Sequence, residues 1–140
     1  MFKKNPKISI VGMGYVGLPL AIEFKKFFRV IGFDIDTNRI KTLLNGVDKN
    51  KQFKKKEILS KNLFLTSDKN KLQDANIFII TVPTPISKNK KPDLKPLISA
   101  TKIISNFVKK DDIIVYESTV YPGCTEEICI PIIEQISKLK

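Results

Sequence analysis

The chain has 140 residues, of which 42% are hydrophobic, so it can bury a core as one domain over residues 1–140. No apolar run is long enough to cross a bilayer and the N-terminus has no apolar signal segment, which predicts a cytoplasmic protein without a membrane partner. The formal net charge is +11, carried mostly by scattered lysines. A specific nucleic-acid surface usually has more arginines and stacking aromatics, so we expect a solvated basic surface, with non-specific polyanion attraction by residues 49–56 as the alternative.

Strand and helix signals alternate along the chain, which is typical of a parallel sheet covered by helices. The expected strands are Ile8–Val11, Val30–Asp34, Leu63–Thr66, Ile77–Val82 and Ile113–Glu117. The expected helices are Tyr15–Phe27, Thr37–Leu44, Lys54–Ser60, Lys69–Leu72, Leu94–Val108 and Thr125–Leu139. The continuous apolar runs suit strands buried on both faces. Together these elements predict an α/β, Rossmann-like doubly wound sheet with strand order 3-2-1-4-5.

Two residues are expected to mark helix features in the second half of the chain. Asp93 precedes an amphipathic segment and is predicted to be its N-cap. Pro131 falls inside the last expected helix, where it would remove a backbone hydrogen bond and bend the helix.

A glycine motif directly follows the first expected strand. Gly12, Gly14 and Gly17 have the spacing Gly-x-Gly-x-x-Gly and lead into an apolar helical segment. In a dinucleotide-binding turn the first glycine permits the tight turn, the second permits close approach of a pyrophosphate, and the third lets the helix pack against the strand. The phosphates would lie at the positive end of that helix. An ordinary glycine-rich loop is the alternative for the motif taken alone.

The second expected strand ends in a carboxylate, Asp34, seventeen residues after Gly17. At this position Asp34 would accept hydrogen bonds from the adenosine ribose and repel a 2′-phosphate, which predicts NAD rather than NADP. A solvated strand-end carboxylate is the other interpretation. Residues 81–85 and 117–123 follow the fourth and fifth expected strands and should line the same crevice, because ligands lie where the strand order reverses.

Cys124 and Cys129 do not form a metal-binding pattern. They are the only two cysteines and the chain has no histidine, so a metal site would lack further soft ligands. We predict no metal and two reduced thiols, as is usual for a cytosolic protein.

Several segments, in chain order, resemble the N-terminal part of UDP-glucose/GDP-mannose dehydrogenases. They are Gly12–Ala21, Gly32–Asp36 with Arg39-Ile40, Val82–Pro85, Lys91–Leu94 and Glu117–Gly123. The stretch Tyr116–Glu127 is most similar to the UDP-N-acetylhexosamine 6-dehydrogenase branch, which acts in capsule and O-antigen synthesis. The resemblance implies oxidation of a sugar C6 hydroxyl to a carboxylate with two NAD consumed.

The resemblance also implies which residues hold the adenosine and pyrophosphate. Residues Gly12 to Gly17 would hold the pyrophosphate, with backbone contacts from Tyr15 and Val16. Asp34 would bind the ribose, and Arg39 would lie beside the adenine. Without the family context, Arg39 fits equally well as a surface residue of a helix.

Two threonines are implied near the reactive end of the cofactor. Thr84 and Thr119 would contact it there, and Thr119 would be the one catalytic residue, because it could position a water near the reacting carbon. Their ordinary alternatives are a stiff loop between two prolines for Thr84 and a backbone hydrogen bond at a strand end for Thr119.

The chain ends at Lys140, before the family pattern does. The remaining part would supply a sixth strand, the sugar-binding domain and the nucleophilic cysteine, whose motif neither Cys124 nor Cys129 matches. We therefore expect a truncated or isolated cofactor domain without turnover, with UDP-sugar a substrate only of the full-length enzyme. Without a sixth strand, Ile113–Glu117 would be an open edge through which a homo-oligomer could form.

Two functions of different classes remain open. The first is the NAD-binding domain of a nucleotide-sugar 6-dehydrogenase, and the second is a stand-alone NAD-binding or interaction module without catalysis. Nucleic-acid binding ranks third, and it predicts salt-sensitive binding that NAD does not displace.

Overall fold

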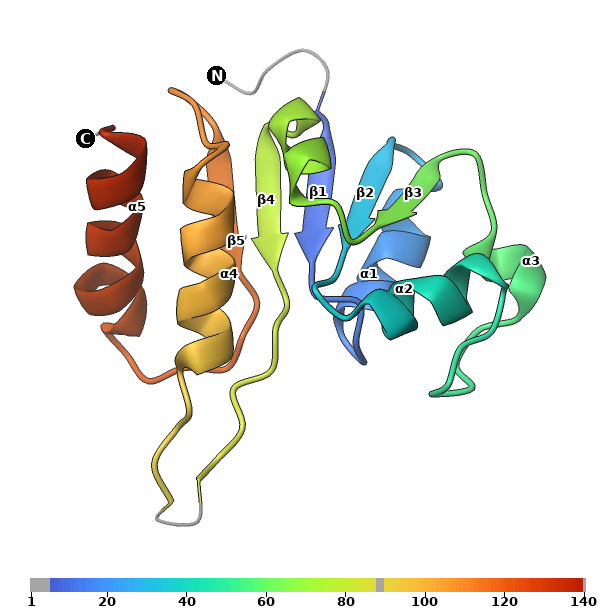
Figure 1. The fold of residues 1–140 in the computed structure, drawn as a ribbon, viewed down its shortest axis with the longest axis horizontal. Coiled ribbons are helices and arrows are strands. Elements are labelled where there is room, and N and C mark those ends of the chain that lie inside the picture. The colour runs from blue at the N-terminus through green and yellow to red at the C-terminus, as the bar shows by residue number, and fades with distance from the viewer. Residues whose placement is uncertain (1–5, 88–89, 140) are drawn as a thin grey trace.

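The computed structural model describes residues 6–87 and 90–139, in which strands and helices alternate along the chain (Figure 1). The strands are β1 (Ile8–Val11), β2 (Val30–Phe33), β3 (Leu63–Thr66), β4 (Ile77–Ile80) and β5 (Ile113–Tyr116). The helices are α1 (Gly17–Phe24), α2 (Thr37–Leu44), α3 (Lys55–Ile58), α4 (Lys95–Ser105) and α5 (Ile130–Ser137). A 3₁₀ helix covers Lys69–Asp74 and a π-helical turn covers Thr125–Cys129.

All five strands run parallel in one sheet with the order β3-β2-β1-β4-β5. The central strand is β1, whose Ile8 is in register with Val30 of β2 on one side and Ile77 of β4 on the other. The chain builds β2 and β3 outward on one side and then crosses to build β4 and β5 on the other. This confirms the predicted doubly wound fold, and the described ranges contain no sixth strand in the sheet.

The sheet has a hydrophobic core on each face. Successive residues of β4 alternate between them, because Ile79 belongs to one cluster and its neighbours Phe78 and Ile80 belong to the other. The first cluster includes buried residues of α1, α2 and α3, and the second includes buried residues of α4 and the π-helical turn. Burial on both faces explains why the inner strands are continuously apolar in sequence.

Helix α1 and the segment before β4 differ from the expected helices. The first helix begins at Gly17 instead of Tyr15, because residues 12–16 form the turn that leaves β1. Before β4 the chain forms a 3₁₀ helix instead of an α-helix, and the side chain of Asp68 accepts a hydrogen bond from the Asn70 backbone N–H at its start. A short polar connection of this kind is enough to move the chain across the sheet to β4.

Asp93 plays a different role from the one predicted, whereas Pro131 lies inside a helix as expected. The N-cap of α4 is Leu94, and the Asp93 carboxylate instead closes a local turn by accepting the Lys95 N–H at 3.0 Å. Pro131 lies at the junction of the π-helical turn and α5, inside an unbroken helical run over residues 124–137, so its predicted position within a helix is confirmed. Its missing N–H removes one helix hydrogen bond, and the helix changes from π to α geometry at this point.

Backbone hydrogen bonds continue one residue beyond the carboxyl ends of the strands. The Asp34 N–H donates to Thr66 O at 3.2 Å, the Thr81 N–H donates to Val11 O at 2.9 Å, and the Glu117 N–H donates to Ile80 O at 2.9 Å. Strands β2, β4 and β5 end one or two residues earlier than predicted, whereas β1 and β3 end where predicted. These bonds hold the loops after β2, β4 and β5 at one edge of the sheet.

Strand β5 forms an open side of the sheet. Among the described strands it pairs only with β4, and each of its residues is half-buried. An apolar groove of about 1030 Å³ lies beside it, lined by residues of α1, β4 and β5 that include Phe24, Ile79 and Val115. Across the described ranges, no helix has both the length and the apolar character of a membrane span.

Candidate functional site

A cavity of about 500 Å³ lies at the carboxyl ends of β1, β2 and β4, where the strand order reverses. Its wall comes from the turn after β1, the segment after β2, α2 and the following residues 49–50, the start of the loop after β4, and α4. Five of the residues predicted from the sequence line it, namely Gly12, Gly14, Tyr15, Asp34 and Arg39. Val16 lies next to this group and is half exposed.

The three glycines of the motif serve different geometric purposes. Gly12 has a φ of +107°, which side chains rarely allow, and its N–H donates to Phe33 O at 2.8 Å. At Gly17 a Cβ would overlap the Gly12 carbonyl oxygen and come within 2.5 Å of the Thr81 Oγ1 atom. A Cβ at Gly14 would meet no atom within 4 Å. The first and third glycines therefore allow the turn and the close helix, while the second leaves open space.

Asp34 braces the glycine turn. One oxygen of its carboxylate, Oδ2, accepts the Met13 N–H at 2.7 Å, and the other, Oδ1, accepts the Asp36 N–H at 2.9 Å. Each carboxylate oxygen can accept a further hydrogen bond. Asp36 in turn begins α2 as an N-cap that accepts the N–H groups of Asn38 and Arg39. The end of β2, the glycine turn and the start of α2 are thus connected through two carboxylates.

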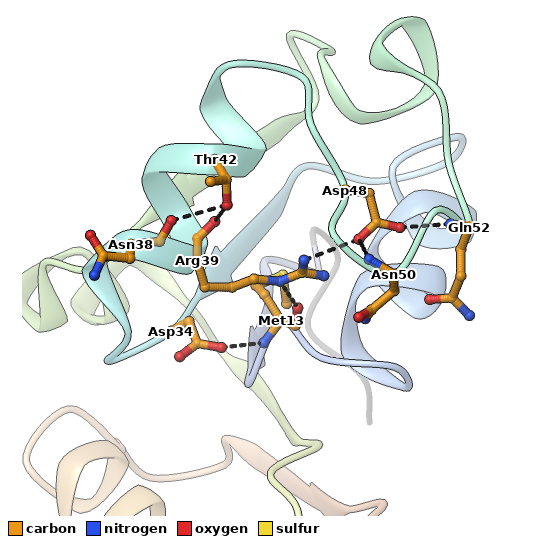
Figure 2. Close-up of polar contacts among 8 residues, drawn as sticks. All are labelled: Met13, Asp34, Asn38, Arg39, Thr42, Asp48, Asn50 and Gln52. Atoms are coloured by element: carbon orange, nitrogen blue, oxygen red, sulfur yellow. Dashed lines mark hydrogen bonds and ion pairs between the residues drawn. The ribbon is translucent and has the colours of Figure 1, made fainter.

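Arg39 reaches from α2 to the same turn, as Figure 2 shows. Its Nε donates to Met13 O at 2.7 Å, and its Nη1 lies 3.0 Å from Oδ1 of Asp48. The side chain of Arg39 is 11% exposed and that of Asp48 has no exposed area. The third nitrogen, Nη2, is buried and has no hydrogen-bond partner among the described residues. Arg39 is therefore an inward-directed part of the cavity wall and not a solvated surface residue.

Asp48 was not anticipated from the sequence. Its carboxylate also accepts the Asn50 N–H at 3.2 Å and the Gln52 N–H at 2.9 Å. Burial alone would raise the pKa of Asp48, but the two backbone N–H groups and the Arg39 guanidinium lower it below its usual value. The available signal was that Asp48 is the one acidic residue between Asn45 and Lys56 in a lysine-rich segment.

The loops after β4 and β5 are joined by two side-chain hydrogen bonds. The Thr84 hydroxyl donates to Thr119 O at 2.6 Å, and the Ser118 hydroxyl donates to Val82 O at 2.6 Å. The structure thus brings Thr84 and Thr119 together, beyond the residues that line the cavity. Thr84 is half-buried and Thr119 is exposed.

The sheet is parallel in this order, a glycine turn leads into α1, and a carboxylate stands at the end of β2. Together these features define a dinucleotide-binding domain of the Rossmann type. The model of the UDP-glucose/GDP-mannose dehydrogenase family, NAD binding domain, matches residues 6–140, and the chain belongs to this family. The resemblance seen in the sequence is therefore confirmed, and NAD is the cofactor of the domain. Over the described ranges, no cluster of side chains is suited to hold a metal ion.

Curated relatives match nearly all of this chain but are much longer. The chain is 52% identical over 132 residues to UDP-N-acetyl-D-glucosamine 6-dehydrogenase of Salmonella typhi, covering 94% of this chain and 31% of that protein. It is 47% identical over 135 residues to Protein CapL of Staphylococcus aureus, covering 96% of this chain and 32% of that protein. The chain thus spans about a third of the length of these relatives.

Solved structures show the same arrangement. The UDP-D-ManNAc dehydrogenase of Pyrococcus horikoshii superposes with a TM-score of 0.85 at 33% identity, covering 96% of this chain and 33% of that one. A ternary complex of GDP-mannose dehydrogenase from Pseudomonas aeruginosa superposes with a TM-score of 0.86 at 29% identity, covering 95% of this chain and 33% of that one.

The glycine geometry predicts opposite outcomes for two similar substitutions. Gly17→Ala should lower the free energy of unfolding by about 1–3 kcal/mol or more, because its methyl group would meet backbone that cannot move aside. Gly14→Ala should stay within about 0.5 kcal/mol of the unmodified chain, because the added methyl group meets open space. Urea denaturation of both variants tests this. Equal loss of stability would contradict the assignment of separate purposes.

Proposed function

We propose that this chain binds NAD in the cavity beside the glycine turn and is the cofactor domain, over residues 1–140, of a UDP-N-acetylhexosamine 6-dehydrogenase. The observation that carries the proposal is that Asp34 and the unobstructed Gly14 line one cavity at the reversal of the strand order. This combination suits a ribose hydrogen bond and a close pyrophosphate at neighbouring points.

The chain's own groups account for binding of the adenosine half. The pyrophosphate would lie against the turn from Gly12 to Gly17, near the start of α1, with Tyr15 and Val16 beside it. Asp34 has acceptor capacity left for the ribose hydroxyls, and its charge would repel a 2′-phosphate. Arg39 lines the cavity and would lie beside the adenine.

The joined loops after β4 and β5 would lie toward the nicotinamide half. The hydrogen bond from Thr84 to Thr119 O supports a fixed spacing between these loops. At this spacing both threonines would contact the cofactor. Thr119 is exposed, and its hydroxyl would position a water for the reaction. Bound NAD would supply the hydride acceptor, while these residues orient it.

The names of the relatives support a role in oxidation of UDP-N-acetylhexosamines, and the name CapL supports one in capsule synthesis. Cys124 and Cys129 are both fully buried within the hydrophobic cluster that includes α4. Burial raises the pKa of the Cys124 thiol. A buried, protonated thiol is a poor nucleophile. We therefore propose that the nucleophilic cysteine implied by the family resemblance lies outside these 140 residues, and that this chain by itself lacks turnover.

The first test is calorimetric titration with NAD⁺ and NADP⁺. Saturable binding of NAD⁺, with NADP⁺ weaker by about tenfold or more, is expected from the Asp34 charge. Asp34→Ala should weaken NAD⁺ binding by about 10- to 100-fold, the loss typical of hydrogen bonds to a charged group. Asp68→Ala is the matched control, because this carboxylate closes a turn outside the cavity lining. A folded chain that binds neither nucleotide would contradict the proposal.

The second test concerns turnover. NADH absorbance should not rise when the chain is mixed with NAD⁺ and UDP-N-acetylglucosamine, and it should rise when the remaining portion of a full-length relative is added as a separate polypeptide. Thr119→Ala should then lower kcat with little change in NAD⁺ affinity, because the proposed role is placement of water. Turnover by the unaided chain would refute the proposal that the nucleophilic cysteine lies outside these residues.

The open side of β5 favours a second candidate function, an interaction module. One edge of β5 is covered by no other described strand and lies beside an apolar groove, and such an edge is a template for pairing with another copy of the chain. Light scattering should show a mass that rises with protein concentration, and Val115→Lys should reduce this rise by placing a charge in the groove. A strict monomer at high concentration would remove the support for this function.

A further inference from the structure

We propose that Asp48 is a positioning residue of the cofactor site, whose carboxylate holds the Arg39 guanidinium on the glycine turn without touching the cofactor. The inference rests on the proposed function in one respect, namely that NAD binds in the cavity beside this turn. Arg39 lines the cavity, whereas Asp48 stands behind it with no exposed side-chain area.

The carboxylate of Asp48 is itself rigidly held. Its two oxygens accept the N–H groups of Asn50 and Gln52, at 3.2 and 2.9 Å, which closes the segment after α2 around the side chain. The remaining acceptor capacity meets Nη1 of Arg39 at 3.0 Å (Figure 2). The Asp48 side of this buried charge pair has its other hydrogen bonds satisfied, which fixes the position of the carboxylate and suits a positioning role.

The guanidinium transmits this geometry to the turn through a single peptide group. Arg39 Nε donates to the Met13 carbonyl oxygen at 2.7 Å. That carbonyl belongs to the same planar, trans peptide as the Gly14 N–H, so the two groups point in opposite directions. Fixing the Met13 carbonyl therefore also fixes the direction of the Gly14 N–H, the group expected to approach the pyrophosphate.

The other side of Met13 is held independently. Its N–H donates to Oδ2 of Asp34 at 2.7 Å, so both peptide groups that flank Met13 are oriented by side chains from beyond the turn. Met13 itself has no exposed area. Asp34 sets one peptide directly, and Asp48 sets the other through Arg39. Loss of Asp48 would leave Arg39 buried without its counter-charge and free to leave the carbonyl.

A double-mutant cycle separates this role from a merely structural one. NAD⁺ affinity is measured by calorimetry for the unmodified chain, Asp48→Asn, Arg39→Gln and the double variant, with thermal unfolding recorded for each. We expect Asp48→Asn to weaken binding by about tenfold, as for a lost hydrogen bond to a charged group. The double variant should bind as Arg39→Gln does, because Asp48 acts only through Arg39.

The matched control is Asp112→Asn. Asp112 also closes a turn with its carboxylate, by accepting the Lys109 N–H at 2.8 Å, but it lies just before β5 at the opposite edge of the sheet. This variant should bind NAD⁺ as the unmodified chain does. If Asp48→Asn does not fold, Asp48→Glu, which keeps the charge but displaces the carboxylate, takes its place and should likewise weaken NAD⁺ binding.

The inference is overturned if folded Asp48→Asn binds NAD⁺ normally, or if the double variant binds more weakly than Arg39→Gln. Weakened binding in Asp34→Ala together with normal binding in Asp48→Asn would overturn this inference and leave the proposed function intact. Failure of the unmodified, folded chain to bind NAD⁺ would overturn both.

Discussion

The close approach of α1 to the ends of β1 and β4 is the contact on which the rest of the structure depends. Gly17 lies so near the Gly12 carbonyl and the Thr81 hydroxyl that no side chain fits between them. The Thr81 hydroxyl donates to the carbonyl oxygens of Val11 and Gly12, at 3.1 and 2.8 Å, which closes this junction from the β4 side. As a result the start of α1 points at the turn, and the cavity opens where the strand order reverses.

The glycine turn is surrounded by acidic side chains, although the whole chain carries a net positive charge. The chain carries a net charge of +11, yet Asp34, Asp36 and Asp48 all act within one network around the turn and Arg39. Each of these carboxylates accepts backbone N–H groups, so each is held in place as well as charged. The scattered lysines attract anions in general, whereas these acidic residues fix the backbone around the turn.

The fold was largely predictable because its signals are local. Continuous apolar runs predicted strands buried on both faces, and the alternation with helical segments predicted the parallel order β3-β2-β1-β4-β5, both of which the structure confirms. The errors fall where local chemistry offers more than one solution. Asp93 closes a turn instead of capping α4, because an aspartate suits either geometry. A π-helical turn precedes Pro131 within the last helix, because a proline cannot complete the regular α-helical hydrogen bonds.

For the site, the sequence by itself indicated the glycine turn and the carboxylate after β2, and the segments Val82–Pro85 and Glu117–Gly123 added the family, because all of these depend on residue types at fixed short spacings. Only the tertiary structure decided that Asp34 braces Met13, that Arg39 turns inward, and that Asp48 is its buried partner. It also decided that Thr84 bonds to Thr119, which is 35 residues away. Such pairs join segments whose separation in sequence carries no signal, and they form only when the parallel sheet brings the strand ends to one edge.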